Sequence, residues 1–229
     1  MNVTNIELIE AIRTRHSVRK YLVRPIEAEK TAALRSLIDE ANVESGLHIQ
    51  LVLDEPRAFS SGILKYGAFS GVKNYLVMAG RKGKDMEEQI GYQGERIVLL
   101  AQSLGLNTCW VGLTYKKIPE AFTLAEGEAV HCVIALGYGE DPGIQHPLKP
   151  LEKFVEVDGE MPAWFQAGME AVLLAPTALN QQKFKFFLRE GNRVEAKALF
   201  AFNGYAAIDL GIAKCHFEIG AGEADFSWV

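Results

Sequence analysis

Apolar residues recur at helical spacing in several separate segments of the chain. A repeat of three to four residues places such side chains on one side of a helix. The repeat predicts helices at residues 6–12, 27–43, 85–104, 162–175 and 204–219. Alternating or short continuous apolar runs predict strands at residues 48–53, 74–79, 108–113, 131–139 and 184–188. The segment 140–150 holds three prolines and a glycine, and is predicted to link two αβ series.

The predicted helix at residues 85–104 contains two glycines, Gly91 and Gly94. A glycine inside a helix costs up to about 1 kcal/mol relative to alanine. We therefore expect another helix or a ligand to approach closely at these positions. Gly105 follows the pattern and is predicted to cap the helix.

The stretch 13–21 carries four basic side chains, a histidine and a serine within nine residues. It follows the first predicted helix and is expected to continue as an extended arm. On an extended backbone, Arg15, Ser17 and Arg19 point to one side. Two guanidinium groups and a hydroxyl on one face suit a phosphate or another planar anion. A solvated basic turn is the alternative interpretation.

Composition narrows the classes of function. The chain has 229 residues, of which 48% are hydrophobic and 23% charged, as in an average globular protein. Its net charge of −5 argues against a nucleic-acid binder. The three cysteines, Cys109, Cys132 and Cys215, suggest no disulfide framework, so a reducing, cytoplasmic location is expected. No signal peptide and no membrane-spanning run is predicted.

Two windows of the sequence resemble each other. Glu40-Ala41 and the strand pattern at residues 48–55 correspond to Glu170-Ala171 and the pattern at 183–190. The second copy has a longer connection, which contains the segment 175–182. The first copy carries the basic arm and the second carries the long turn. This division suggests a duplicated unit with one composite site, whereas chance similarity between two ordinary αβ corners is the alternative.

Three motifs resemble those of the nitroreductase family of flavoproteins. The arm 15–19 is similar to the family's Arg-x-Ser-x-Arg motif. The segment 176–184 resembles its Pro-Ser-x-x-Asn-x-Gln-Pro-Trp loop, with Thr177 in place of serine and Lys183-Phe184 in place of Pro-Trp. Residues 105–112 resemble its Gly-Leu-x-Thr-Cys-Trp-x-Gly strand. Because the loop comes late in the chain, the resemblance is to a single-chain branch that mimics the family's homodimer.

The resemblance implies an α+β, three-layer fold with two related halves, at about residues 1–145 and 146–229, in one domain. It also implies an FMN site that is shared between the halves. The arm residues would contact the phosphate, the ribityl chain and the pyrimidine edge, the 176–182 turn would close over the cofactor, and amides near Gly112 would face the flavin edge. The expected FMN-binding residues are Arg15, His16, Ser17, Arg19, Val111, Gly112, Lys149, Pro176, Thr177, Leu179, Asn180 and Gln182.

The implied reaction passes two electrons from NAD(P)H to a nitro compound, a quinone or a related small acceptor, and needs no catalytic side chain. The sequence agrees with this, since its histidines lack triad or metal-ligand spacing. A single chain that mimics the dimer is expected to be a monomer. Two other functions stay open: a flavin-storage or sensing protein, and a scaffold that has lost flavin. The loop at residues 56–71 offers Phe59, Tyr66 and Phe69 as possible pocket-lining residues, although ordinary packing is the simpler interpretation.

Overall fold

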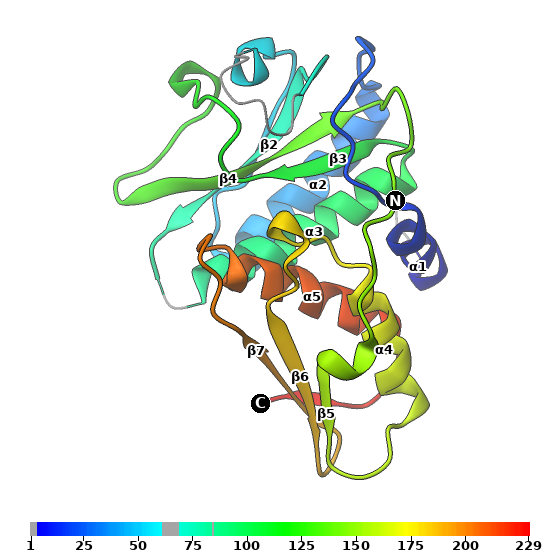
Figure 1. Cartoon of the computed structure of the whole chain (residues 1–229). Helices are drawn as coiled ribbons and strands as arrows, with labels where there is room; N and C mark the ends of the chain where they lie inside the picture. Colours follow the sequence, from blue (N-terminus) through cyan, green and yellow to red (C-terminus); the bar gives the residue numbers. More distant parts are fainter. Residues whose placement is uncertain (1–3, 61–68, 84) are drawn as a thin grey trace.

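The computed structural model describes residues 4–60, 69–83 and 85–229 (Figure 1). Its helices are α1 (Asn5–Thr14), α2 (Ala28–Ser45), α3 (Met86–Ser103), α4 (Ala163–Leu173) and α5 (Ala206–Ala221). Its strands are β1 (Gln50–Val52), β2 (Asn74–Arg81), β3 (Asn107–Val111), β4 (Glu128–Gly137), β5 (Val155–Val157), β6 (Phe184–Arg189), β7 (Arg193–Ala198) and β8 (Ser227–Trp228). Short 3-10 turns include η4 (Ala178–Asn180). None of the helices in these ranges has the length and apolar character needed to cross a membrane.

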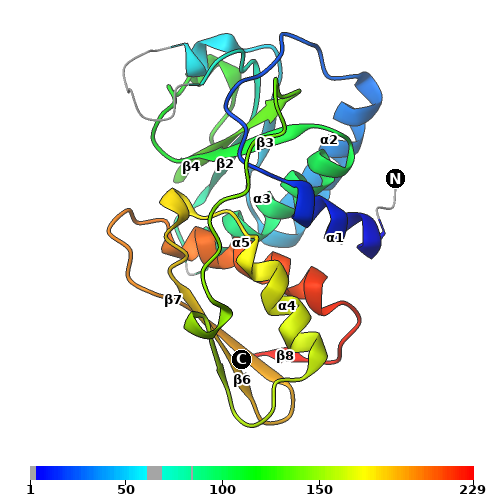
Figure 2. The ribbon, with the colours of Figure 1, turned by 45° about the vertical axis from the view of Figure 1, so that its right-hand side comes forward.

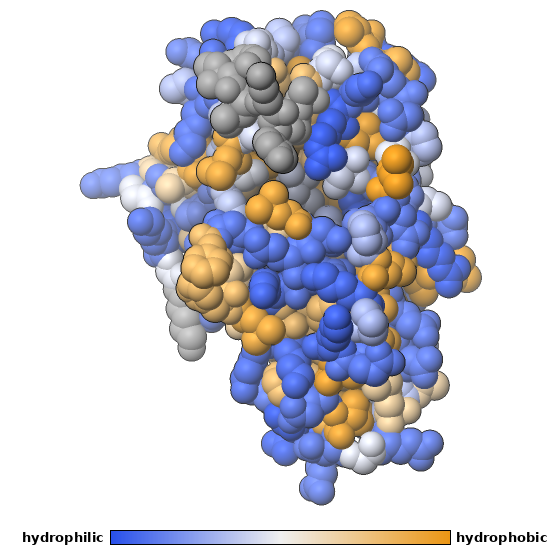
Figure 3. Space-filling view, in the orientation of Figure 1, coloured by the Kyte–Doolittle hydropathy of each residue, from blue (hydrophilic) through white to orange (hydrophobic). Residues whose placement is uncertain are grey.

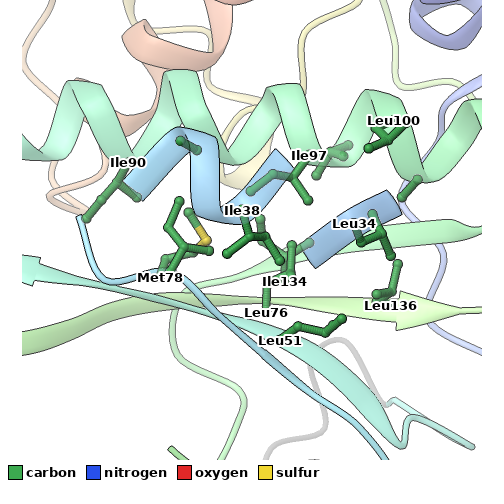
Figure 4. Close-up of a cluster of buried hydrophobic side chains, with 14 of the residues drawn as sticks. Leu34, Ile38, Leu51, Leu76, Met78, Ile90, Ile97, Leu100, Ile134 and Leu136 are labelled. Atoms are coloured by element: carbon green, nitrogen blue, oxygen red, sulfur yellow. The ribbon is translucent and has the colours of Figure 1, made fainter. Parts of the chain in front are cut away.

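The first sheet has the strand order β1-β2-β4-β3, and every pairing in it is antiparallel. Helices α2 and α3 cover one of its faces. Figure 4 shows Leu34 and Ile38 of α2 together with Ile97 of α3 above the strand residues Leu76 and Ile134. These side chains are at most 4% exposed, so this layer is a continuous apolar core.

The second sheet has the order β5-β6-β7-β8 and is mixed. β6 and β7 form an antiparallel hairpin, whereas β5 and β8 pair in parallel with their neighbours. Helices α4 and α5 pack on it through an aromatic cluster that includes Phe165, Phe186 and Phe217. The helices therefore lie between two sheets, which confirms the expected mixed, three-layer fold (Figures 1 and 2).

Helices α3 and α5 join the two layers, and they cross at a glycine from each. A Cβ on Gly91 would lie 2.0 Å from the carbonyl oxygen of Ile208, and one on Gly211 would lie 1.9 Å from that of Glu88. Each glycine thus contacts the residue three positions before the other. The contact is reciprocal, and the two backbones touch without side chains between them. The close approach expected at Gly91 is confirmed, and at Gly94 the neighbour is the Trp110 ring.

The sequence located all five helices within a few residues, and Gly105 ends α3 with a φ of +74°. It missed β5, β7 and β8. Those strands are short or mostly polar, and only Val194 of β7 is buried, so their apolar signal is weak. The predicted halves 1–145 and 146–229 each contain one sheet. Their similarity stays a prediction, since one sheet is antiparallel and the other mixed.

Replacing Gly91 or Gly211 with alanine should destabilise the protein. A glycine-to-alanine change within a helix normally gains up to about 1 kcal/mol. Here the added methyl meets backbone rather than a movable side chain, and overpacking costs roughly 1–3 kcal/mol. We expect a lower free energy of unfolding for both variants in urea denaturation. Gly83→Ala is the control, because the nearest atom to its Cβ is 3.9 Å away. A gain in stability for the helix variants would contradict the crossing.

Candidate functional site

The basic arm begins where α1 ends. Arg15 caps the helix in an extended conformation, with φ −72° and ψ 119°. Val18 N–H then donates to the carbonyl of Thr108 at 3.0 Å, and Tyr21 N–H to that of Ser70 at 2.9 Å. Glu140 N–H donates to the carbonyl of Lys20 at 3.0 Å. The arm is therefore extended, as predicted, and is held by β3 at Val18 and by the segments around Ser70 and Glu140 further along.

Three arm side chains gather around the thiol of Cys109. Burial raises the pKa of this thiol, while Arg19, a hydrogen bond from Ser17, and Arg15 act in the opposite direction. Their exposure nevertheless differs, since Arg15 is buried, Ser17 is half-buried and Arg19 is exposed. Burial lowers the pKa of the neighbouring His16, and the charge of Arg15 lowers it further. The arm thus presents several hydrogen-bond donors near Cys109, from the exposed Arg19 to the buried Arg15.

Arg15 is only 4% exposed and faces the fully buried carboxylate of Glu95. Its Nε lies 3.8 Å from Glu95 Oε1, which is too long for a hydrogen bond, and has no hydrogen-bond partner among the described residues. Glu95 instead accepts from His216 Nε2 and from Trp110 Nε1, both at 2.9 Å. Burial raises the pKa of Glu95, but these contacts outweigh it, so the pKa is lowered overall.

The long turn at residues 176–182 follows α4. Lys149 Nζ donates to the carbonyl of Gln181 at 2.8 Å, and Asn180 Nδ2 donates to that of Pro147 at 3.2 Å. Ala178 N–H donates to Asp209 Oδ1 at 2.9 Å. The turn is thus held from one side by the 140–150 segment and from the other by the first turn of α5.

The turn stores backbone strain and unpaired polar atoms. Leu179, Asn180 and Gln182 have φ values of 54°, 52° and 50°, in the left-handed region that favours glycine. Asn180 Oδ1 and Gln182 Oε1 are buried and have no hydrogen-bond partner within the described ranges. Leu179 is 83% exposed, and Figure 3 shows apolar surface over η4 with hydrophilic surface below it. Strain and unpaired acceptors concentrated in one turn are typical of a ligand-binding segment.

At the end of β3, Val111 is buried and Gly112 is half-buried. A Cβ on Gly112 would lie 2.5 Å from the hydroxyl oxygen of Tyr205. The tyrosine, which precedes α5, therefore packs directly against the glycine that was expected to face a flavin. Phe200 and Phe202 in the preceding connection are 77% and 96% exposed, and Figure 3 shows apolar surface over this connection.

The arm and the turn lie on the same side of the protein, joined by the 140–150 segment. Gly143 contacts the arm, since a Cβ there would lie 2.9 Å from His16 Cβ. Lys149, six residues later, binds the turn, and six extended residues span at most about 20 Å. The turn reaches the end of α4, where Gln182 Nε2 donates to the carbonyl of Leu173 at 3.4 Å. The arm is linked to the same helix end only indirectly, because Arg15 faces Glu95, Glu95 binds His216, and His216 Nδ1 donates to the carbonyl of Ala171 at 3.0 Å.

Sequence reasoning missed four residues of this region: Glu95, Tyr205, Asp209 and His216. Three of them are on or next to α5, whose apolar pattern predicted only packing. A charged residue in an apolar stripe, as Glu95 and Asp209 are, was the available signal. Burial raises the pKa of Asp209 to about 7, against a partial lowering by the amide of Ala178, and Asp209 Oδ2 has no partner in the described part of the chain.

Two cavities lie outside the residues expected to bind FMN, and the second includes Ser70, which is hydrogen bonded to the arm. One, of about 370 Å³, is lined by residues that include Lys82, Glu88 and His131. The other, of about 290 Å³, is lined by residues that include Phe59 and Phe69, two of the three aromatics considered for a pocket. Tyr66 lies outside the described residues. Within those residues no cluster of three or more metal-binding side chains occurs.

Comparison with known proteins gives one family and a set of similar folds. The family described as "Putative TM nitroreductase" matches residues 7–221. A structure described as a "putative nitroreductase" from Thermotoga maritima is 25% identical, with a TM-score of 0.64, and the match covers 96% of this chain and 86% of that one.

Two other structures are more distant. One, described as a "Putative NADH dehydrogenase/NAD(P)H nitroreductase" from Parabacteroides distasonis, is 19% identical, with a TM-score of 0.51 and coverage of 65% and 96%. The other, a nitroreductase with bound FMN from Bacteroides fragilis, is 22% identical, with a TM-score of 0.47 and coverage of 63% and 94%. No curated protein sequence matches the chain.

Asp209 should make the stability of the protein depend on pH. Its pKa rises from 3.8 to about 7 on folding, so the unfolded chain ionises first as the pH increases. Stability should therefore fall between about pH 4 and pH 7 and level off above that, by about 1.4 kcal/mol for each pKa unit. Asp209→Asn should flatten this profile and be more stable than the wild type at pH 8. The measurement is urea denaturation across this range, with the exposed Asp39→Asn as control. Parallel profiles for wild type and Asp209→Asn would contradict the assignment.

Proposed function

We propose that this chain, which belongs to the nitroreductase family, is an FMN-dependent oxidoreductase. The observation that carries the proposal is that the 140–150 segment contacts both the basic arm, at Gly143, and the strained turn, at Lys149. The arm and the turn both resemble flavin-binding motifs of the family. A single segment in contact with both supports a cofactor site that they share.

The unpaired atoms of the region fit the chemistry of FMN. Among the described residues, the buried Nε of Arg15 has no hydrogen-bond partner, and a guanidinium suits a phosphate or a carbonyl edge. Within the same residues the buried side-chain oxygens of Asn180 and Gln182 have no donor, and they suit hydroxyl or N–H groups. Donors on the arm and acceptors on the turn thus match a ligand that carries both kinds of group.

The residues of the chain would bind and orient the cofactor. Arg15, His16, Ser17 and Arg19 would hold its anionic and polar parts, with Lys149 contributing a further charge. Pro176, Thr177, Leu179, Asn180 and Gln182 would close over it, and the amides at Val111 and Gly112 would face its reactive edge. Bound FMN would supply the two-electron chemistry, taking a hydride from NAD(P)H and reducing a nitro, quinone or related acceptor. The side chains would provide position and electrostatics only.

We also propose that the chain mimics a family homodimer and acts as a monomer in the cytoplasm. The crossing of α3 and α5 supports this. Gly91 and Gly211 contact each other's helices through equivalent positions, Glu88 and Ile208, each three residues before its glycine. Equivalent contacts in both directions are the signature of a local twofold relation. Sedimentation at micromolar concentration tests the monomer directly.

Arg15→Ala should weaken FMN binding. Charge-assisted hydrogen bonds contribute roughly 1.5–3 kcal/mol, which corresponds to about a 10- to 100-fold rise in Kd. The variant should fold, because Glu95 keeps its bonds to His216 and Trp110. Quenching of FMN fluorescence measures the affinity. Arg13→Ala is the control, since Arg13 is an exposed side chain in the last turn of α1. Equal affinities of the two variants would count against the arm as the site.

The FMN-loaded protein should be reduced by NADH or NADPH and reoxidised by a nitroaromatic or a quinone. The visible spectrum follows both steps under anaerobic conditions. Bound FMN that neither nucleotide reduces would favour a storage or sensing protein. Protein that takes up no added FMN would favour a scaffold without flavin, and would defeat the proposal.

A further inference from the structure

The fully buried pair of Glu95 and His216 lies behind Arg15 and belongs to none of the family motifs in the sequence. We propose that both are positioning residues, which hold Arg15 in place while leaving its hydrogen-bond donors free for the anionic part of the ligand. The inference rests on the proposed function, because it assumes that Arg15 binds FMN.

The hydrogen bonds of Glu95 and His216 indicate which of their atoms carry protons. His216 Nδ1 lies 3.0 Å from the carbonyl of Ala171, which can only accept, so this nitrogen carries a proton. Nε2 lies 2.9 Å from Glu95 Oε1, and a second proton must lie between them. Burial acts against ionisation, but the contacts with His216, Arg15 and Trp110 lower the pKa of Glu95 overall. A carboxyl group is also ordinarily a stronger acid than an imidazolium, so we infer that Glu95 is ionised and accepts this proton in a hydrogen bond from Nε2. Together, imidazolium and carboxylate carry no net charge.

This pairing explains why Arg15 stays available. Glu95 Oε1 is bound by His216 and Oε2 by Trp110, so the carboxylate has its hydrogen-bond partners without Arg15. Its negative charge is still only 3.8 Å from Arg15 Nε, at a site where both side chains are at most 3% exposed. Attraction at this distance is strong in a poorly solvated site. The carboxylate therefore orients the guanidinium without occupying it.

The pair also couples the two parts of the site. Glu95 is on α3, His216 is on α5, and Trp110 is on β3 beside the arm. Through Ala171, the histidine reaches the end of α4, where the turn starts. The end of α4 is thus connected to Arg15 through His216 and Glu95, and it also holds Gln182 by a direct hydrogen bond.

Glu95→Gln tests the proposal with little change in shape. The amide can donate to a neutral His216 Nε2 and accept from Trp110 Nε1, so both neighbours of residue 95 keep their hydrogen bonds. The carboxylate charge facing Arg15 is lost together with the charge of His216, so the net charge of the pair does not change. We expect at least a 10-fold rise in the Kd for FMN and a lower midpoint potential of the bound flavin, because a mispositioned Arg15 no longer favours the reduced anion.

Glu88→Gln is the matched control, because Glu88 forms an ion pair with Lys214 between the same two helices, at 2.5 Å. It should leave both values unchanged. An affinity of Glu95→Gln within twofold of the wild type would overturn the inference, while loss of FMN binding in Arg15→Ala would still support the proposed function. Wild-type protein that does not bind FMN would defeat the function itself.

A measurement on the wild-type protein keeps the inference testable if Glu95→Gln does not fold. Nitrogen-15 NMR of His216 reports the protonation of each ring nitrogen. Two protonated nitrogens support an ionised Glu95 facing Arg15. An unprotonated Nε2 would mean that the proton is on Glu95, which could then not act as a counter-charge, and the inference would fail.

Discussion

The contact on which the rest of the structure depends is the backbone crossing of α3 and α5 at Gly91 and Gly211. With no side chain between them, the two helices approach more closely than ordinary packing allows. Glu95 lies one turn beyond Gly91, and His216 lies about one turn beyond Gly211. The crossing therefore brings a carboxylate and an imidazole to 2.9 Å in the interior, where neither is solvated. A wider crossing would separate them and leave two buried charges unpaired, which is strongly destabilising.

The same crossing sets the distance between the two sheets, and thus between the arm and the turn. The arm is hydrogen bonded to the edge of the first sheet, and the turn is held by α4 and by Asp209 at the start of α5. Neither segment has a core of its own. Each is positioned by an element that the α3–α5 contact holds in place. The site therefore combines residues from both layers of the structure.

Much of this organisation could be predicted from local patterns. The helices follow from apolar spacing, and Gly91 signalled a close contact because a helical glycine needs compensation. The arm could be predicted because alternation of polar residues defines an extended segment. Short edge strands such as β5 could not, since their pairing depends on a neighbour 31 residues away, as for Val155 and Phe186.

The ionic contacts of the site could not be predicted from the sequence for a related reason. Arg15, Glu95 and His216 are far apart in the sequence, and each is unremarkable alone. Only the packing of α3, α5 and the arm makes them neighbours. Tyr205 was missed likewise, because its contact with Gly112 joins β3 to the residue before α5.

A buried guanidinium whose Nε has no hydrogen-bond partner among the described residues carries a free-energy penalty in the folded protein. Burial lowers the pKa of Arg15, and the charge of Glu95 offsets only part of that effect. The unpaired oxygens of Asn180 and Gln182, and the left-handed residues around them, add to the penalty. A ligand that supplies an anion to the arm and donors to the turn relieves these terms together. Part of the affinity for such a ligand therefore comes from relief of the strain that folding places in the site. A change that removed this strain would stabilise the free protein but weaken ligand binding.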